Sequence, residues 1–146
     1  LFREKKIKKQ YWAIVEEKPP VESGELVNWL KKNQVKNKSR AYEMEVRESK
    51  KAILKYQLIG RSKNYFYLKI DPTTGRHHQI RVQLSFIGCQ IKGDVKYGAK
   101  RTNKDGGIHL FARSISFIHP IKKEELTITA NPPVDPLWNE FLNLSS

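Results

Sequence analysis

The chain has 146 residues, which suits a single domain with a buried core. It contains 28 Lys and Arg residues against 15 Asp and Glu, a net charge of +13 that favours a polyanionic partner over a neutral one. An anionic membrane surface is the second choice, but no apolar run is long enough to span or anchor, so we expect no membrane partner. The single cysteine, Cys89, excludes an internal disulfide, and no signal peptide is present, so we expect a cytoplasmic protein.

The first third of the chain is expected to contain a strand followed by a helix. Apolar residues occupy both sets of alternate positions in residues 9–17, which predicts a strand that is buried on both faces. Two prolines follow and end this strand. Leu26, Val27 and Leu30 have helical spacing and predict a helix over residues 22–32, with Ser23 as its N-cap. The basic stretch at 31–40 is interpreted as a solvated connector.

The middle of the chain alternates like a sheet. Strands are predicted over residues 41–47, 52–59 and 65–70, and residues 60–64 form the connection between the last two. Residues 80–87 fit either a strand or a helix, and Thr74 as a possible cap and Gly88 as a possible stop favour a helix.

The last third begins with a turn over residues 93–98. It continues with strands over 108–118 and 125–129 and a closing helix over 136–144. Strands joined by tight turns predict an α+β domain with a mainly antiparallel sheet and a few flanking helices.

The chemistry of the side chains excludes several functions. His77 and His78 are adjacent and cannot share one helix face, and Cys89 has no companion at ligand spacing, so no metal site is expected. No phosphate-binding glycine loop is present, so nucleotide cofactors are not expected either. Aromatic residues beside basic ones suit unstacked RNA bases with their phosphates held by Arg and Lys.

The segment from Thr74 to Leu84, TGRHHQIRVQL, is the most distinctive in the chain. Together with Gly93-Asp94, Tyr97-Gly98 and the earlier KQYWA stretch at 9–13, it resembles the signature of RluA-type pseudouridine synthases. The likeness extends from about Lys9 to about Trp138. The resemblance implies a bent antiparallel sheet crossed by an active-site cleft. It also implies the isomerisation of uridine to pseudouridine in structured RNA, without a cofactor. We expect the partner to be ribosomal RNA rather than transfer RNA, and we expect no binding of DNA.

The resemblance also assigns roles to residues. Tyr11 matches the tyrosine that packs on the flipped base and is a candidate to take its C5 proton. Arg81 matches the arginine that pairs with the catalytic aspartate, and Ile80 matches the apolar wall of the pocket. Arg76 and His77 lie in the same motif and are expected at the substrate, Arg76 at a phosphate or in the turn and His77 through packing or hydrogen bonds.

One departure from the family pattern is large. The family's catalytic aspartate lies in a His-Arg-Leu-Asp motif upstream of the tyrosine, and this sequence has no such motif. None of its four aspartates can be carried over as nucleophile, and Asp94 is interpreted as a structural turn residue. Because the sequence begins at Leu1 rather than methionine, we expect residues 1–146 to be the C-terminal part of a catalytic domain, inactive alone. The alternative is a non-catalytic RNA-binding module with the same fold.

Overall fold

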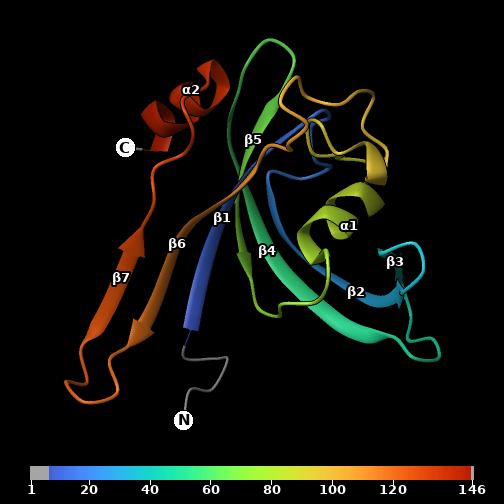
Figure 1. Ribbon diagram of the computed structural model, residues 1–146, viewed down its shortest axis with the longest axis horizontal. Coiled ribbons are helices and arrows are strands. Elements are labelled where there is room, and N and C mark those ends of the chain that lie inside the picture. The colour runs from blue at the N-terminus through green and yellow to red at the C-terminus, as the bar shows by residue number, and fades with distance from the viewer. Residues whose placement is uncertain (1–6, 146) are drawn as a thin grey trace.

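The computed structural model describes residues 7–145, and these form one antiparallel sheet with a helix against each face (Figure 1). The sheet has seven strands in the order β3-β2-β4-β5-β1-β6-β7. Their bounds are β1 Ile7–Val15, β2 Ser23–Asn33, β3 Lys38–Tyr42, β4 Lys50–Arg61, β5 Phe66–Pro72, β6 Leu110–Ile118 and β7 Glu125–Thr129. The helices are α1 Gln79–Phe86 and α2 Pro136–Ser145, with a 3-10 turn, η2, at Val95–Tyr97. The prediction of an α+β domain with a mainly antiparallel sheet is confirmed.

The strand β1 runs through the centre of the core, with β5 on one side and β6 on the other. Trp12 and Ile14 point to one face and pack with Trp138 and Phe141 of α2. The alternate side chains of β1 point to the other face, where α1 contributes Ile80 and Leu84 to a second core cluster. Burial on both faces explains why the sequence of β1 is apolar at successive positions.

The predicted helix at 22–32 is wrong, because these residues form β2, which pairs with β4 from Ser23↔Gln57 to Leu30↔Lys50. Leu26 and Leu30 are four residues apart, a spacing that fits one face of a helix and also one face of a strand. Ser23 therefore begins a strand instead of capping a helix.

The predicted solvated connector at 31–40 and strand at 41–47 are also wrong in their bounds. β2 continues to Asn33, β3 covers only Lys38–Tyr42, and the two strands form a hairpin. Figure 1 shows this hairpin at the edge of the sheet, beside α1, with β2 and β4 curving beneath the helix.

The other predicted elements are confirmed within a few residues, including the helix at 80–87, which appears as α1. Gly88 follows this helix with a φ of +83°, a conformation that glycine adopts without steric cost. Thr74 does not cap it: the N-cap position is His78, in the left-handed region at φ 53°. No helix within residues 7–145 is long and apolar enough to cross a membrane.

Candidate active site

A cavity of about 460 Å³ lies between the first strand and the N-terminal end of α1. Its lining includes Tyr11, Arg76, Ile80 and Arg81, four of the five site residues expected from the sequence. The fifth, His77, is not among the residues that line it. No aspartate or glutamate lines it either, within the part of the chain that the structure describes.

A hydrogen-bonded turn sets the position of α1 at the cavity. Gln79 is buried, and its side-chain oxygen accepts hydrogen bonds from the Thr74 hydroxyl at 2.7 Å and the Arg76 backbone N–H at 2.9 Å. Its amide donates to the backbone carbonyl of Ile53 on β4 at 3.0 Å. The motif glutamine therefore connects the turn to the sheet, a role that the sequence alone does not indicate.

Arg81 is held by a buried carboxylate. Its Nε and Nη2 donate to the two carboxylate oxygens of Asp94 at 2.9 and 2.7 Å, and Asp94 is 1% exposed. The bidentate bond to Asp94 raises the pKa of Arg81. Arg81 Nη1 also donates to His78 Nε2 at 3.2 Å, so three of the five guanidinium N–H groups are bonded. The remaining two have no partner within residues 7–145 and are available to a second acceptor in the cavity.

His78 connects Arg81 to the 3-10 turn. Because a guanidinium can only donate, His78 Nε2 is an acceptor and the proton of the neutral ring lies on Nδ1, which donates to the Tyr97 hydroxyl at 2.7 Å. Burial, followed by the positive charge of Arg81, lowers the pKa of His78 to about 4. The ring is therefore neutral at neutral pH, as this hydrogen-bond arrangement requires.

Tyr11 projects from β1 beside a bulge in its pairing with β6, between Gln10 and Tyr11. It is half-buried, and its hydroxyl has no hydrogen-bond partner within residues 7–145. Ile80, 7% exposed, forms part of the core beneath the cavity. Arg76 also lines it, with its Nε donating to the Lys51 carbonyl at 2.9 Å, so the rest of its guanidinium remains available.

His77 faces the β2–β3 hairpin instead of the cavity. Its Nε2 lies 3.0 Å from the Asn37 side-chain oxygen and its Nδ1 lies 2.9 Å from the Ser39 hydroxyl. Burial, followed by the nearby charges of Lys32 and Lys96, lowers the pKa of His77. The side chain therefore attaches the hairpin to the active-site motif.

Among the described residues, the arrangement thus provides an apolar wall, a phenol without a hydrogen bond and an anchored guanidinium around a cavity that no carboxylate lines. A planar aromatic or heterocyclic ligand fits such walls, and the two free N–H groups of Arg81 fit an oxyanion or carboxylate. Within residues 7–145 no group of three or more His, Cys, Asp or Glu side chains has the geometry to hold a metal ion.

Comparison with known proteins gives a consistent result. Residues 1–86 match a model of a family described as RNA pseudouridylate synthase. The chain is 30% identical over 160 residues to tRNA pseudouridine synthase C of Haemophilus influenzae, covering 97% of this chain and 65% of that protein. It is 34% identical over 152 residues to ribosomal large subunit pseudouridine synthase C of Buchnera aphidicola subsp. Schizaphis graminum, covering 97% of this chain and 46% of that protein.

The fold is also similar to that of a solved structure, human RNA pseudouridylate synthase domain containing 4. The TM-score is 0.73 at 22% identity, over 96% of this chain and 62% of that one. The chain therefore spans between about half and two thirds of the length of these proteins. By its sequence match and its fold, the chain belongs to the RNA pseudouridylate synthase family.

Proposed function

We propose that the chain is the C-terminal part of the catalytic domain of a pseudouridine synthase acting on structured RNA in the cytoplasm. The supporting observation is the convergence on one cavity of Tyr11, from β1, with Ile80 and Arg81, which are neighbours in α1 and distant from Tyr11 in the sequence. The flipped uracil packs between Tyr11 and Ile80. The catalytic carboxylate is supplied by a segment that this sequence does not contain and is held by the free N–H groups of Arg81.

The reaction proposed is an isomerisation that needs no cofactor. The bond between N1 and C1′ breaks, the base turns, and a bond forms between C5 and C1′. The proton leaves C5, for which the Tyr11 phenol in the cavity lining is the candidate acceptor, and N1 is protonated. Arg76, at the rim, contacts a phosphate. Ribosomal RNA is proposed before transfer RNA because several of the similar proteins are named for the large ribosomal subunit.

The test is the release of tritium from C5-labelled uridine in transcripts of large-subunit ribosomal RNA and of transfer RNA. We expect no release by residues 1–146 alone, and release by a form that also carries the family's His-Arg-Leu-Asp segment. Turnover by residues 1–146 alone would place a nucleophile among the four aspartates and refute the supplied carboxylate.

The Arg81→Lys variant of the active form tests the role of the guanidinium. Lysine keeps the charge but loses the two-point geometry, and a misplacement of about 1 Å can cost roughly a hundredfold in rate. We expect the single-turnover rate to fall by about that factor while RNA affinity stays within a few fold. Lower affinity with an unchanged rate at saturating enzyme would make Arg81 a phosphate contact instead.

A second candidate function, an RNA-binding module without activity, is favoured by one observation: no carboxylate lines the cavity within residues 7–145. RNA binding without tritium release by the form that carries the His-Arg-Leu-Asp segment would establish this alternative.

A further inference from the structure

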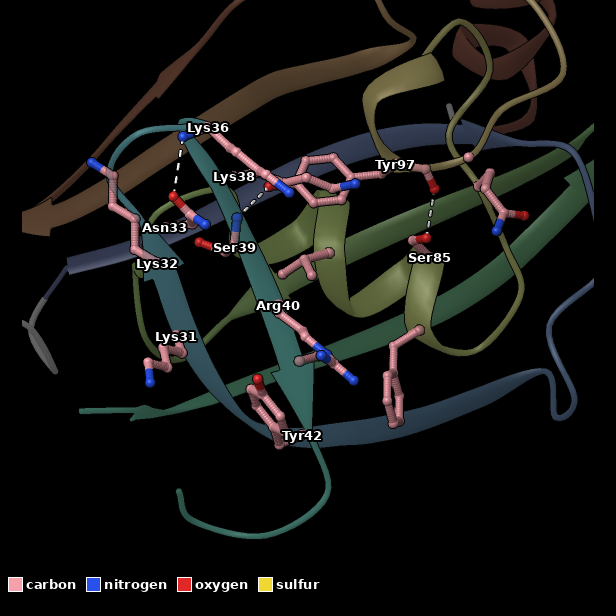
Figure 2. A pocket seen from close by; sticks show the side chains of 15 residues that line it. Lys31, Lys32, Asn33, Lys36, Lys38, Ser39, Arg40, Tyr42, Ser85 and Tyr97 are labelled. Carbon is pink, nitrogen blue, oxygen red and sulfur yellow. Dashed lines mark hydrogen bonds between the residues drawn. The ribbon is translucent and has the colours of Figure 1, made fainter. Parts of the chain in front are cut away.

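A second, larger cavity of about 960 Å³ opens on the other side of α1, between this helix and the β2–β3 hairpin (Figure 2). The hairpin provides five cationic residues to its lining, and the α1 side provides Val82, Ser85, Phe86 and Tyr97. No acidic residue among residues 7–145 lines it. The five cations are Lys31, Lys32, Lys36, Lys38 and Arg40, and we call this cavity the basic groove.

The positive charge of the basic groove is not compensated by ion pairs in the part of the chain that the structure describes. None of the five cations forms an ion pair with any of residues 7–145. Lys31 lies directly opposite Arg40 in the pairing of β2 with β3, and like charges in that arrangement are destabilising. A polyanion in the groove would remove this repulsion, so the charge pattern favours a ligand over a purely structural role.

The groove is formed in advance of any ligand. The Tyr97 hydroxyl accepts a hydrogen bond from the backbone N–H of Ser39 at 2.9 Å, which joins the edge strand β3 to η2. Ser39 and Ala41 are buried, whereas Lys38 and Arg40, on the alternate positions of β3, are exposed. Binding therefore does not require the hairpin to fold onto the domain, which lowers the entropic cost.

Aromatic rings lie among the cations. Phe86, at the end of α1, is 44% exposed, and the half-buried Tyr42 has the Arg40 guanidinium 5.0 Å from its ring centre. Rings that bases can stack on, next to cations that hold phosphates, are typical of sites for unpaired nucleic acid. An acidic peptide would use the cations but would have no need of an exposed phenylalanine.

We propose that the basic groove binds the RNA strand that flanks the target uridine, with phosphates at the hairpin cations and a base on Phe86. This inference rests on the proposed function, because the flanking strand is defined by the uridine in the catalytic cavity. The α1 helix separates the two cavities, and its eight residues span only about 12 Å at 1.5 Å per residue. Nucleotides next to the target are therefore within reach of the groove.

The test compares two triple variants that lose the same charge. In one, Lys36, Lys38 and Arg40 are replaced by Gln. In the control, the exposed Lys63, between β4 and β5, and Lys122 and Lys123, between β6 and β7, are replaced by Gln. Figure 1 shows both of these connections away from the β2–β3 hairpin. Affinity for a large-subunit ribosomal RNA transcript is measured at several salt concentrations, with circular dichroism to confirm folding.

The effect of losing three phosphate contacts on RNA affinity can be calculated. With a slope of about 0.7 per contact for a single strand, the groove variant should bind about 50-fold more weakly at 0.15 M salt, and its salt slope should be about two smaller. The control should remain within about threefold of the parent. A groove variant that binds no more weakly than the control would overturn the proposal.

Lysine acetylation of the unsubstituted protein gives an answer that does not depend on the variants. Bound RNA should protect Lys31, Lys32, Lys36 and Lys38 but leave Lys122 and Lys123 reactive. Poly-glutamate is the comparison ligand: protection of the groove lysines by it and not by RNA would assign the groove to an acidic protein segment and overturn the proposal.

Tritium release on the same RNA separates the two proposals. Turnover combined with unchanged affinity of the groove variant would refute the groove and leave the proposed function standing. Groove-dependent binding without turnover, in the form that carries the His-Arg-Leu-Asp segment, would refute the catalytic function and leave the groove as an RNA site.

Discussion

The ion pair between Arg81 and Asp94 gives the most direct energetic test of the active-site arrangement. Asp94 is 1% exposed and Arg81 is 20% exposed, and two short charge-assisted bonds join them. The Asp94→Asn variant keeps the shape of the side chain but removes its charge, and it places an amide donor against one guanidinium donor. Arg81 is then left partly buried without a counter-charge.

The magnitude follows from the burial of the two partners. Removal of one partner from a buried pair costs about 3–5 kcal/mol, because the other charge remains desolvated. Water reaches part of Arg81, so we expect a value near the lower limit, about 3 kcal/mol for Asp94→Asn. At about 2–4 °C per kcal/mol for a domain of this size, the melting temperature should fall by about 6–12 °C.

The assay is a double-mutant cycle with Arg81→Gln, measured by urea unfolding at pH 7. If the pair accounts for the loss, the double variant should be less destabilised than the sum of the singles, with a coupling energy of about 2 kcal/mol. Unchanged urea m-values would show that the unfolded state is not altered. Additive effects, or a cost for Asp94→Asn within the ~0.5 kcal/mol of an ordinary surface change, would refute the assignment of Asp94 as the residue that holds Arg81.

Two further predictions concern the same region. The pKa of His78 in the folded protein, about 4, lies below its ordinary value of 6.5. The contribution of His78 to stability is therefore fully present above pH 6.5 and is lost as the pH falls towards 4. Urea unfolding at a series of pH values should show a weaker pH dependence in this range for His78→Gln, and an unchanged pH dependence would contradict the prediction. Gly93 has a φ of +90°, and a Cβ there would lie 2.7 Å from the Gly107 carbonyl oxygen, whereas a Cβ on Gly106, at φ +78°, meets nothing within 4 Å. Gly93→Ala should therefore cost about 3 kcal/mol and Gly106→Ala only about 1 kcal/mol by thermal melting, and equal losses would show that backbone strain alone matters.

The parts of the fold that were predictable are those in which local pattern and tertiary packing agree. β7 has the predicted bounds because apolar and polar residues alternate along its whole length. For α1, Gly88 favours a helix over a strand, and this glycine does follow the end of the helix. β2 could not be predicted because the spacing of Leu26 and Leu30 is compatible with the period of a helix and with that of a strand. Its identity is determined by pairing with β4, which is not visible in the sequence of β2 itself.

The candidate site was predictable through its motif, and its supporting contacts were not. The cavity contains Tyr11, Ile80 and Arg81 as expected from the resemblance, although their roles remain predictions. Asp94 was interpreted as a structural turn residue, but nothing in its sequence context shows that the turn places it against Arg81. The burial of Asp94 is visible only in the structure, and the sequence shows no more than an aspartate between Gly93 and a nearby aromatic residue, Tyr97.

The basic groove shows why composition alone does not separate a solvated loop from a binding surface. Residues 31–40 were interpreted as a solvated connector, and their side chains are indeed largely exposed. What distinguishes them is a hydrogen bond between Ser39 and Tyr97, 58 residues apart, which fixes the hairpin beside α1. Held there, the lysines cannot spread apart as they would on a free loop, so their mutual repulsion persists in the folded protein. A bound RNA strand would reduce that repulsion, and salt would weaken the binding, because both effects arise from the same uncompensated charges.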